Sequence, residues 1–240
     1  MGWIEYWDDK PTIYVNRRHR EAHYRGVSDG LIANLGEGRP AVLDYGCGEA
    51  LFADRVARQC GRLYLCDAAP SVRGELQRRF ASIDNIVVVS PEDVAGLPAG
   101  SLDLIVANSV IQYLSPADLD RCLEQWKRLL GPGGRLLVAD VIPPSVSPLT
   151  DALALLDFGR REGFLLAAGA GLVRTFFSNY RKVRAALGLQ QFTAEDMIAR
   201  LAAHGLSAHR HHPNLGHNQS RMAFVAVRAD GDAKAHSSHA

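Results

Sequence analysis

The sequence lacks a surplus of charge of either sign. Its 240 residues include 27 lysines and arginines against 26 aspartates and glutamates, which gives a formal net charge of +1. No overall electrostatic field therefore attracts the chain to nucleic acid or to an acidic membrane. With a hydrophobic content of 47%, the chain can bury one full core, so we expect one domain with additions.

Cysteine is scarce, and long apolar runs are missing. The four cysteines, at positions 47, 60, 66 and 122, are not spaced as zinc ligands are. The longest nearly apolar run, 163–173, is shorter than the ~20 residues that a membrane-spanning helix needs. The acidic and aromatic N-terminus does not have the layout of a signal peptide. These absences predict a cytoplasmic protein with reduced thiols, no metal and no integral membrane association.

What the chain does contain is an apolar strand that leads through a glycine turn into a helix, within residues 41–57. Gly46 and Gly48 have no Cβ, so the backbone can turn sharply and approach a ligand closely. Asp44 precedes the turn, where a carboxylate would repel a pyrophosphate but would suit an ammonium or sulfonium group. The third glycine of the dinucleotide-binding fingerprint is missing, because that position is Leu51.

This stretch resembles the first motif of the class I S-adenosylmethionine-dependent methyltransferases, whose pattern is roughly acid-x-Gly-x-Gly-x-Gly. Asp44, Gly46 and Gly48 match it, and Ala50 stands where a third glycine is usual. The resemblance implies an α/β, Rossmann-like, doubly wound sheet of seven strands in the order 3-2-1-4-5-7-6, with an antiparallel last strand. It also implies S-adenosyl-L-methionine as the cofactor.

Later landmarks extend the resemblance along the chain. Asp67 ends the next strand, 19 residues after Gly48, where an acid is placed to accept hydrogen bonds from ribose hydroxyls. In the family, the acid four residues before a Leu-Pro step binds the adenine amino group, which points to Asp93, with Glu92 as the alternative. The predicted cofactor-binding residues are Asp44, Gly46, Cys47, Gly48, Asp67, Asp93, Val94 (through its backbone N–H) and Asn108 (through its backbone).

The resemblance covers roughly residues 38–228, and the remaining segments surround it. We expect an N-terminal lid at 1–37, a methyltransferase domain at 38–228 with an inserted helical cap at 143–190, and a disordered tail at 229–240. Insertions of this kind usually shape the acceptor pocket in the family. The basic bias of this one suits an anionic acceptor, or only a solvated helical face.

Candidate acceptor residues come from the lid, from strand ends and from the last loop. Each has a plainer interpretation as well: a packing helix for the lid residues, a cap for a strand-end acid, and a polar hairpin tip for the loop. His217 is the predicted general base, because Gly216 beside it permits close approach. The predicted substrate-binding residues are Tyr14, His19, His23, Tyr113, Asp140 and Asn218.

The predicted function is methyl transfer to oxygen or nitrogen of a small-molecule acceptor. Asn108 is followed by Ser109 and Val110, not by the rest of the Asn-Pro-Pro-Tyr tetrad of amino-directed DNA methyltransferases, so no nucleic acid is expected. A non-catalytic S-adenosylmethionine-binding module is the alternative. A nicotinamide-dependent oxidoreductase is disfavoured by Asp44 and by the absent third glycine. The acceptor's identity and the oligomeric state are left open.

Overall fold

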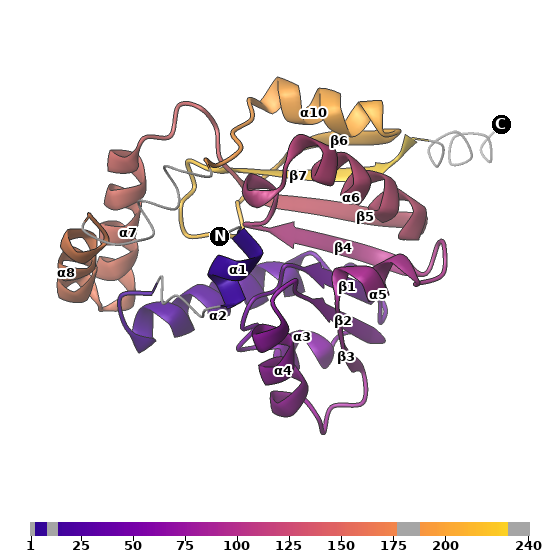
Figure 1. The fold of residues 1–240 in the computed structure, drawn as a ribbon, viewed down its shortest axis with the longest axis horizontal. Coiled ribbons are helices and arrows are strands. Elements are labelled where there is room, and N and C mark those ends of the chain that lie inside the picture. Colours follow the sequence, from indigo (N-terminus) through magenta and orange to yellow (C-terminus); the bar gives the residue numbers. More distant parts are fainter. Residues whose placement is uncertain (1–2, 9–13, 177–187, 230–240) are drawn as a thin grey trace.

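A seven-stranded sheet forms the centre of the protein (Figure 1). The computed structural model describes residues 3–8, 14–176 and 188–229. The strand order is β3-β2-β1-β4-β5-β7-β6, with β7 antiparallel to both of its neighbours, which confirms the predicted topology. The strands are β1 Ala41–Tyr45, β2 Arg62–Cys66, β3 Ile86–Val89, β4 Leu102–Asn108, β5 Leu130–Val141, β6 Leu206–His211 and β7 Met222–Arg228.

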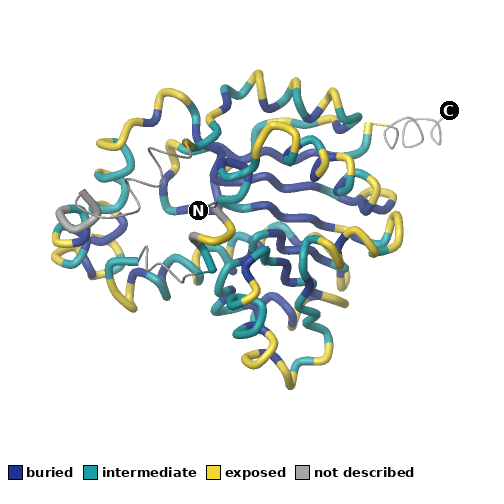
Figure 2. The backbone as a smooth tube through the Cα atoms, in the orientation of Figure 1, coloured by how far each residue is buried: buried dark blue, intermediate teal, exposed yellow. Residues whose placement is uncertain are grey.

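Helices cover both faces of this sheet, and its central strands are largely buried, whereas the edge strands β3 and β6 are mostly half-buried (Figure 2). Because side chains alternate along a strand, Val42 packs into the core on one face while Leu43 packs on the other. The first face carries α2 Arg17–Ala33, α3 Ala53–Ala57 and α4 Pro70–Arg79, and the second carries α5 Pro91–Ala95, α6 Pro116–Leu129 and α10 Ala194–Ala203.

Local capping chemistry explains where several helices begin. The Asn16 side chain accepts a hydrogen bond of 2.8 Å from the His19 N–H and starts α2. Ser115 caps α6, and Pro116 is its first residue. Thr193 and Asp196 form a capping box at the start of α10. The fold therefore follows sequence signals at each of these points.

The inserted segment forms two helices beyond the carboxyl ends of the parallel strands (Figure 1). They are α7 Pro148–Glu162 and α8 Leu165–Phe176, joined at Gly163 in the left-handed conformation. Phe158 and Phe164 pack against Ala22 of α2, so the cap is joined to the N-terminal segment. The rest of the predicted cap at 177–187, and the predicted tail apart from residue 229, lie outside the described residues.

Two short helices lie at the edge of the sheet where the parallel strands end. Helix α1 Trp3–Asp8 lies against the start of α4, where the Ser71 N–H donates to Asp8 Oδ1 at 2.8 Å. A 3₁₀ helix, η1 Ile111–Tyr113, follows β4, and the rings of Trp7 and Tyr113 meet edge to face at 5.7 Å. The N-terminal segment thus lies across this edge, in the position predicted for a lid.

Candidate functional site

The glycine turn after β1 is tightly packed against protein side chains. Gly46 and Gly48 have φ angles of +73° and +57°, which favour glycine. A Cβ on Gly46 would clash with the Val110 side chain, and one on Gly48 would lie 2.7 Å from the Tyr24 hydroxyl. The glycines are therefore required for close packing within the protein. This requirement comes in addition to the predicted close approach of a ligand. Ala50 also has a positive φ, of 41°, which explains why a glycine is usual there.

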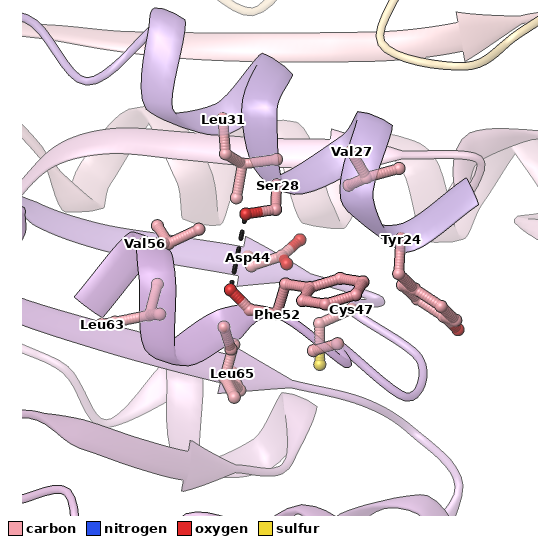
Figure 3. A pocket seen from close by; sticks show the side chains of 12 residues that line it. Tyr24, Val27, Ser28, Leu31, Asp44, Cys47, Phe52, Val56, Leu63 and Leu65 are labelled. Atoms are coloured by element: carbon pink, nitrogen blue, oxygen red, sulfur yellow. Dashed lines mark hydrogen bonds between the residues drawn. The ribbon is translucent and has the colours of Figure 1, made fainter. Parts of the chain in front are cut away.

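Asp44 is a buried carboxylate that lies beside this turn. It lines a small pocket between α2, β1 and α3, among Ser28, Phe52 and Cys47 (Figure 3). Within the described residues it has no hydrogen-bond or ion-pair partner, although only 7% of its surface is exposed. Burial, followed by the negative charge of Asp67, raises its pKa to about 7. A carboxylate in this condition fits a ligand that brings positive charge, which is the chemistry of the methionine part of S-adenosylmethionine.

Asp67 connects the end of β2 to the glycine turn. Its carboxylate accepts hydrogen bonds from the Gly48 N–H at 3.0 Å and from the Ala69 N–H at 2.9 Å. Burial nevertheless raises its pKa, because the loss of hydration outweighs these bonds. The structure brings Asp67 to the turn as predicted and gives it a second role, in holding the turn in place.

Asp93 and Val94 are engaged within α5, which the sequence analysis did not foresee. The Asp93 carboxylate accepts a hydrogen bond of 2.8 Å from the Ser90 N–H and completes a capping box. The same bond lowers the pKa of this carboxyl. The Val94 N–H donates to the Ser90 carbonyl at 3.1 Å. Both groups thus take part in the local structure of α5, and their contact with adenine stays a prediction.

Asn108, at the end of β4, presents an unsatisfied side chain. Its Oδ1 atom is buried and has no hydrogen-bond partner among the described residues. Such an atom is costly unless a ligand or water donates to it. Asn108 was predicted to bind through its backbone, and this side-chain oxygen is a second candidate group for binding.

Tyr24 of α2 closes over the turn from the lid. Its hydroxyl accepts a hydrogen bond of 2.9 Å from the Glu49 N–H. Tyr14 contacts Tyr24 and both lid histidines, with ring centroids 5.3 Å from His19 and 5.5 Å from His23. Burial raises the pKa of both tyrosines, so they stay neutral and can only form hydrogen bonds.

The predicted base, His217, lies against the cap. Its ring stacks on Phe158 at 4.7 Å, and the His19 ring stacks on Phe164 at 4.9 Å. The His19 and His217 rings are 6.3 Å apart, so the structure brings these two predicted residues together. Burial lowers the pKa of His217, and it lowers the pKa values of His19 and His23 to about 4. All three imidazoles are therefore neutral near pH 7 and can accept a proton.

Asp140 is held in a polar network at the end of β5. Its carboxylate accepts hydrogen bonds from the Ser109 hydroxyl at 2.6 Å and from the Asn214 amide at 3.3 Å, and it pairs with Arg221 at 2.7 Å. Because these partners occupy the carboxylate, the geometry gives it a structural role and does not support its use as a free base. A Cβ on Gly216 would lie 2.9 Å from the same carboxylate, so Gly216 permits packing onto Asp140.

The network continues into the cap through residues that sequence reasoning missed. Arg221 also pairs with Asp151 of α7 at 3.1 Å. Asn218 donates to Asp151 at 2.8 Å and is 4% exposed, so this predicted substrate residue is engaged within the protein. No motif or spacing marks Arg221 or Asp151, because their meeting depends on how the cap packs. Within the part of the chain that the structure describes, no cluster of histidine, cysteine and acidic residues could hold a metal ion.

Comparison with known proteins also indicates a methyltransferase. Residues 43–138 match a family described as "Methyltransferase domain". An uncharacterized methyltransferase of Mycobacterium bovis is 30% identical over 124 residues, which cover 52% of this chain and 60% of the relative. The chain thus spans about 60% of the length of such relatives. A malonyl-[acyl-carrier protein] O-methyltransferase of Serratia marcescens is 27% identical over 210 residues, 85% of this chain and 79% of the relative.

Among solved structures, the magnesium protoporphyrin IX methyltransferase of Synechocystis with bound S-adenosylmethionine has a TM-score of 0.54. The two proteins are 16% identical in sequence, and the match covers 90% of this chain and 84% of the Synechocystis chain. The likeness shows that they share a fold. In the ranges that the structure describes, no helix has the length and apolar character to span a bilayer.

Proposed function

We propose that this chain, which belongs to the class I S-adenosylmethionine-dependent methyltransferases, transfers a methyl group to oxygen or nitrogen of a small-molecule acceptor. Its cofactor, when bound, supplies a methyl carbon made electrophilic by a sulfonium. Asp44 and the buried Asn108 oxygen would hold the positively charged methionine end, and Asp67 would hold the ribose. We also propose a cytoplasmic location, supported by the four free, buried cysteines.

The observation that carries this proposal is the closure of the acceptor side by three separate parts of the chain. The lid contributes His19 and His23, the cap contributes Phe158, and the last loop contributes His217. His19 and Phe158 are less than 9% exposed. A region enclosed in this way suits a small acceptor and excludes the bulk of a nucleic acid.

The chemistry that the chain must supply is orientation and, for some acceptors, removal of a proton. Aligning two reactants in a closed site can contribute roughly 7–11 kcal/mol to lowering the barrier. His217, neutral because burial lowers its pKa, is the proposed group that accepts a proton from the acceptor. Its ring position is fixed by stacking on Phe158.

The test is incubation with S-adenosylmethionine carrying a tritiated methyl group, together with a metabolite extract separated by ultrafiltration into small molecules and macromolecules. We expect label in the small-molecule fraction. Label found only on protein would show that the acceptor is bound to a carrier protein and is not a free small molecule. Cofactor binding by calorimetry with no transfer in any fraction would support a non-catalytic module. Binding of NAD without binding of S-adenosylmethionine would overturn the proposal entirely.

A further inference from the structure

A three-membered ion cluster of Asp140, Asp151 and Arg221 lies near the proposed base His217, so it would form one wall of the proposed acceptor side. Arg221 Nη1 lies 2.7 Å from Asp140 Oδ2, and Arg221 Nη2 lies 3.1 Å from Asp151 Oδ1. The exposed fractions of these side chains are 18% for Arg221, 9% for Asp140 and 22% for Asp151. Their charges are therefore screened much less than those of surface pairs. Two carboxylates against one guanidinium leave a net charge of −1 in this wall.

The groups around the cluster do not cancel that charge. The charged groups that act on His217 are Asp140, Arg221, Asp151 and Arg161. Arg161 pairs with Asp157 at 3.0 Å, and both are about half exposed, so its field is largely paired and screened. His23 is neutral, and the charges of Asp140 and His217 also affect its pKa. The wall beside the proposed base is therefore net negative.

A net negative wall favours a reaction that moves positive charge toward it. We propose that the acceptor atom is the nitrogen of a neutral amine, an inference that rests on the methyltransferase function proposed above. The nitrogen lone pair forms the new C–N bond, the bond from the methyl carbon to sulfur breaks, and its electron pair stays on sulfur. Positive charge leaves the sulfonium and appears on the methylated nitrogen, next to Asp140 and Asp151. His217 then takes the surplus proton and leaves a neutral, methylated amine.

The same wall opposes the main alternatives. A phenolate, an alkoxide or a carboxylate would bring negative charge against Asp140 and Asp151. Arg221 could not offset that charge, because both of its carboxylate partners already engage it. Arg160 and Arg161 of the cap share the single carboxylate of Asp157, which leaves one positive charge, but their side chains are 72% and 54% exposed, so solvent and salt screen that charge far more than the buried cluster.

Unpaired carbonyl oxygens give independent support. Two side-chain oxygens, Asn108 Oδ1 at the end of β4 and Gln112 Oε1 in η1, are buried and have no hydrogen-bond partner among the residues that the structure describes. Gln112 is 3% exposed, so water is not readily available to it. Both atoms require a donor, and the ammonium of the cofactor can supply one of them. An amine brings further N–H groups, whereas a phenolate or a carboxylate brings only acceptors.

The first test needs no acceptor. Sinefungin carries an amine in place of the methylsulfonium of S-adenosylmethionine, and S-adenosylhomocysteine carries no charge there. We expect the wild-type protein to bind sinefungin about fivefold or more tightly than S-adenosylhomocysteine in calorimetry at low salt. Asp151→Asn should reduce this ratio toward one with little change for S-adenosylhomocysteine. Glu124→Gln, at an exposed position of α6, should leave the ratio unchanged. Equal binding of the two ligands by the wild type would overturn the inference.

The second test identifies the chemistry of the product. Label from tritiated S-adenosylmethionine should enter material that a cation exchanger retains and that alkali does not release. Volatile label released by alkali would reveal a methyl ester, and neutral, alkali-stable label would reveal an ether; either overturns the amine while the methyltransferase function stands. Absence of any transfer overturns the proposed function, and the amine with it.

Discussion

Ser109 and Asp140, at the ends of the neighbouring strands β4 and β5, share the left-handed backbone region and are joined by a hydrogen bond of 2.6 Å. Their φ angles are +58° and +61°, values that side chains other than glycine rarely adopt. Strain of this kind persists only where the surrounding structure enforces it, and it is common at functional sites. The pair lies at the edge where, in the proposed function, the cofactor and acceptor sides meet.

Replacing Asp140 should weaken this edge. Asparagine tolerates the left-handed conformation, so Asp140→Asn removes the charge that Arg221 pairs with while leaving the backbone acceptable. We expect the free energy of unfolding to fall by about 1.5–3 kcal/mol, the scale of hydrogen bonds to a charged group. Urea denaturation would measure the change. Asp157→Asn, at an exposed ion pair, serves as the matched control and should change stability by less than about 0.5 kcal/mol. Equal effects of the two variants would show that the network does not hold the edge.

The sheet and the glycine turn could be predicted from the sequence because their signals are local. An apolar run, two glycines and an acid specify β1 and its turn, and capping residues specify α6 and α10. The ion cluster could not be predicted, since Asp140, Asp151 and Arg221 are far apart in the sequence and meet only through packing of the cap. The local role of Asp93 in the capping box of α5 was also not predicted, although Ser90 and Asp93 have the spacing of such a box.

Gly46 offers a test of why the turn needs glycine. Gly46→Ala would place a methyl group against Val110 at a positive φ, and the backbone term alone costs about 1–2 kcal/mol. We expect a marked loss of thermal stability together with loss of cofactor binding. If the clash with Val110 is the main cause, the Gly46→Ala/Val110→Ala double variant should lose less stability than the sum of the losses in the two single variants. The expected difference in the free energy of unfolding is about 0.5–3 kcal/mol. If the two losses of stability are instead strictly additive, backbone strain at position 46, and not contact with Val110, is the reason that the turn needs glycine.

Asp44 should link stability to pH in the direction opposite to most carboxylates. Its pKa is about 7 in the folded protein against its usual 3.8, so the folded state binds its proton more tightly. Below both values Asp44 has no effect on stability; as the pH rises from 4 to 7, the unfolded chain loses the proton first and the folded state is destabilised. Asp44→Asn should therefore stabilise the protein without cofactor at pH 8 by about 2–4 kcal/mol, and hardly at all at pH 4.

The same substitution should weaken binding of S-adenosylmethionine by about 1.5–3 kcal/mol, because a carboxylate that meets a positive charge is lost. Wild-type affinity should rise as the pH increases toward 8, and the variant should lose this dependence. Calorimetry at several pH values measures both effects. Asp54→Asn, on the exposed surface of α3, is the control. A variant that binds normally would remove Asp44 from the cofactor site.

Asp67→Ala should affect both binding and stability. Besides the ribose contact, it removes the acceptor for the N–H groups of Gly48 and Ala69, and each N–H left unsatisfied costs about 1–3 kcal/mol. We therefore expect a lower melting temperature alongside weaker cofactor binding. Unchanged affinity in a folded variant would assign Asp67 to the turn alone.

His217 can be tested as the base through its pH dependence. His217→Ala should lower the methyl-transfer rate by about 10²–10⁴-fold while leaving cofactor affinity nearly unchanged, because a general base acts in the transition state. Burial lowers the pKa of His217 below its usual 6.5, so the wild-type rate should fall only as the pH drops below that value. The variant should lose that limb of the profile. His217→Gln keeps a polar side chain of similar length and cannot take the proton, so it should match alanine.

The competing outcome for His217 is equally specific. If both variants keep the wild-type rate and pH profile, either the nitrogen arrives already deprotonated and orientation alone drives the reaction, or another base acts. His23 is then the nearest alternative, since it feels the charge of His217 and of Asp140, but its pKa of about 4 would shift the acidic limb to a lower pH. A fall in rate centred near pH 4 that survives in His217→Ala would assign the proton to His23 or to His19, whose pKa values are both about 4. Loss of that fall in His23→Ala, but not in His19→Ala, would then identify His23.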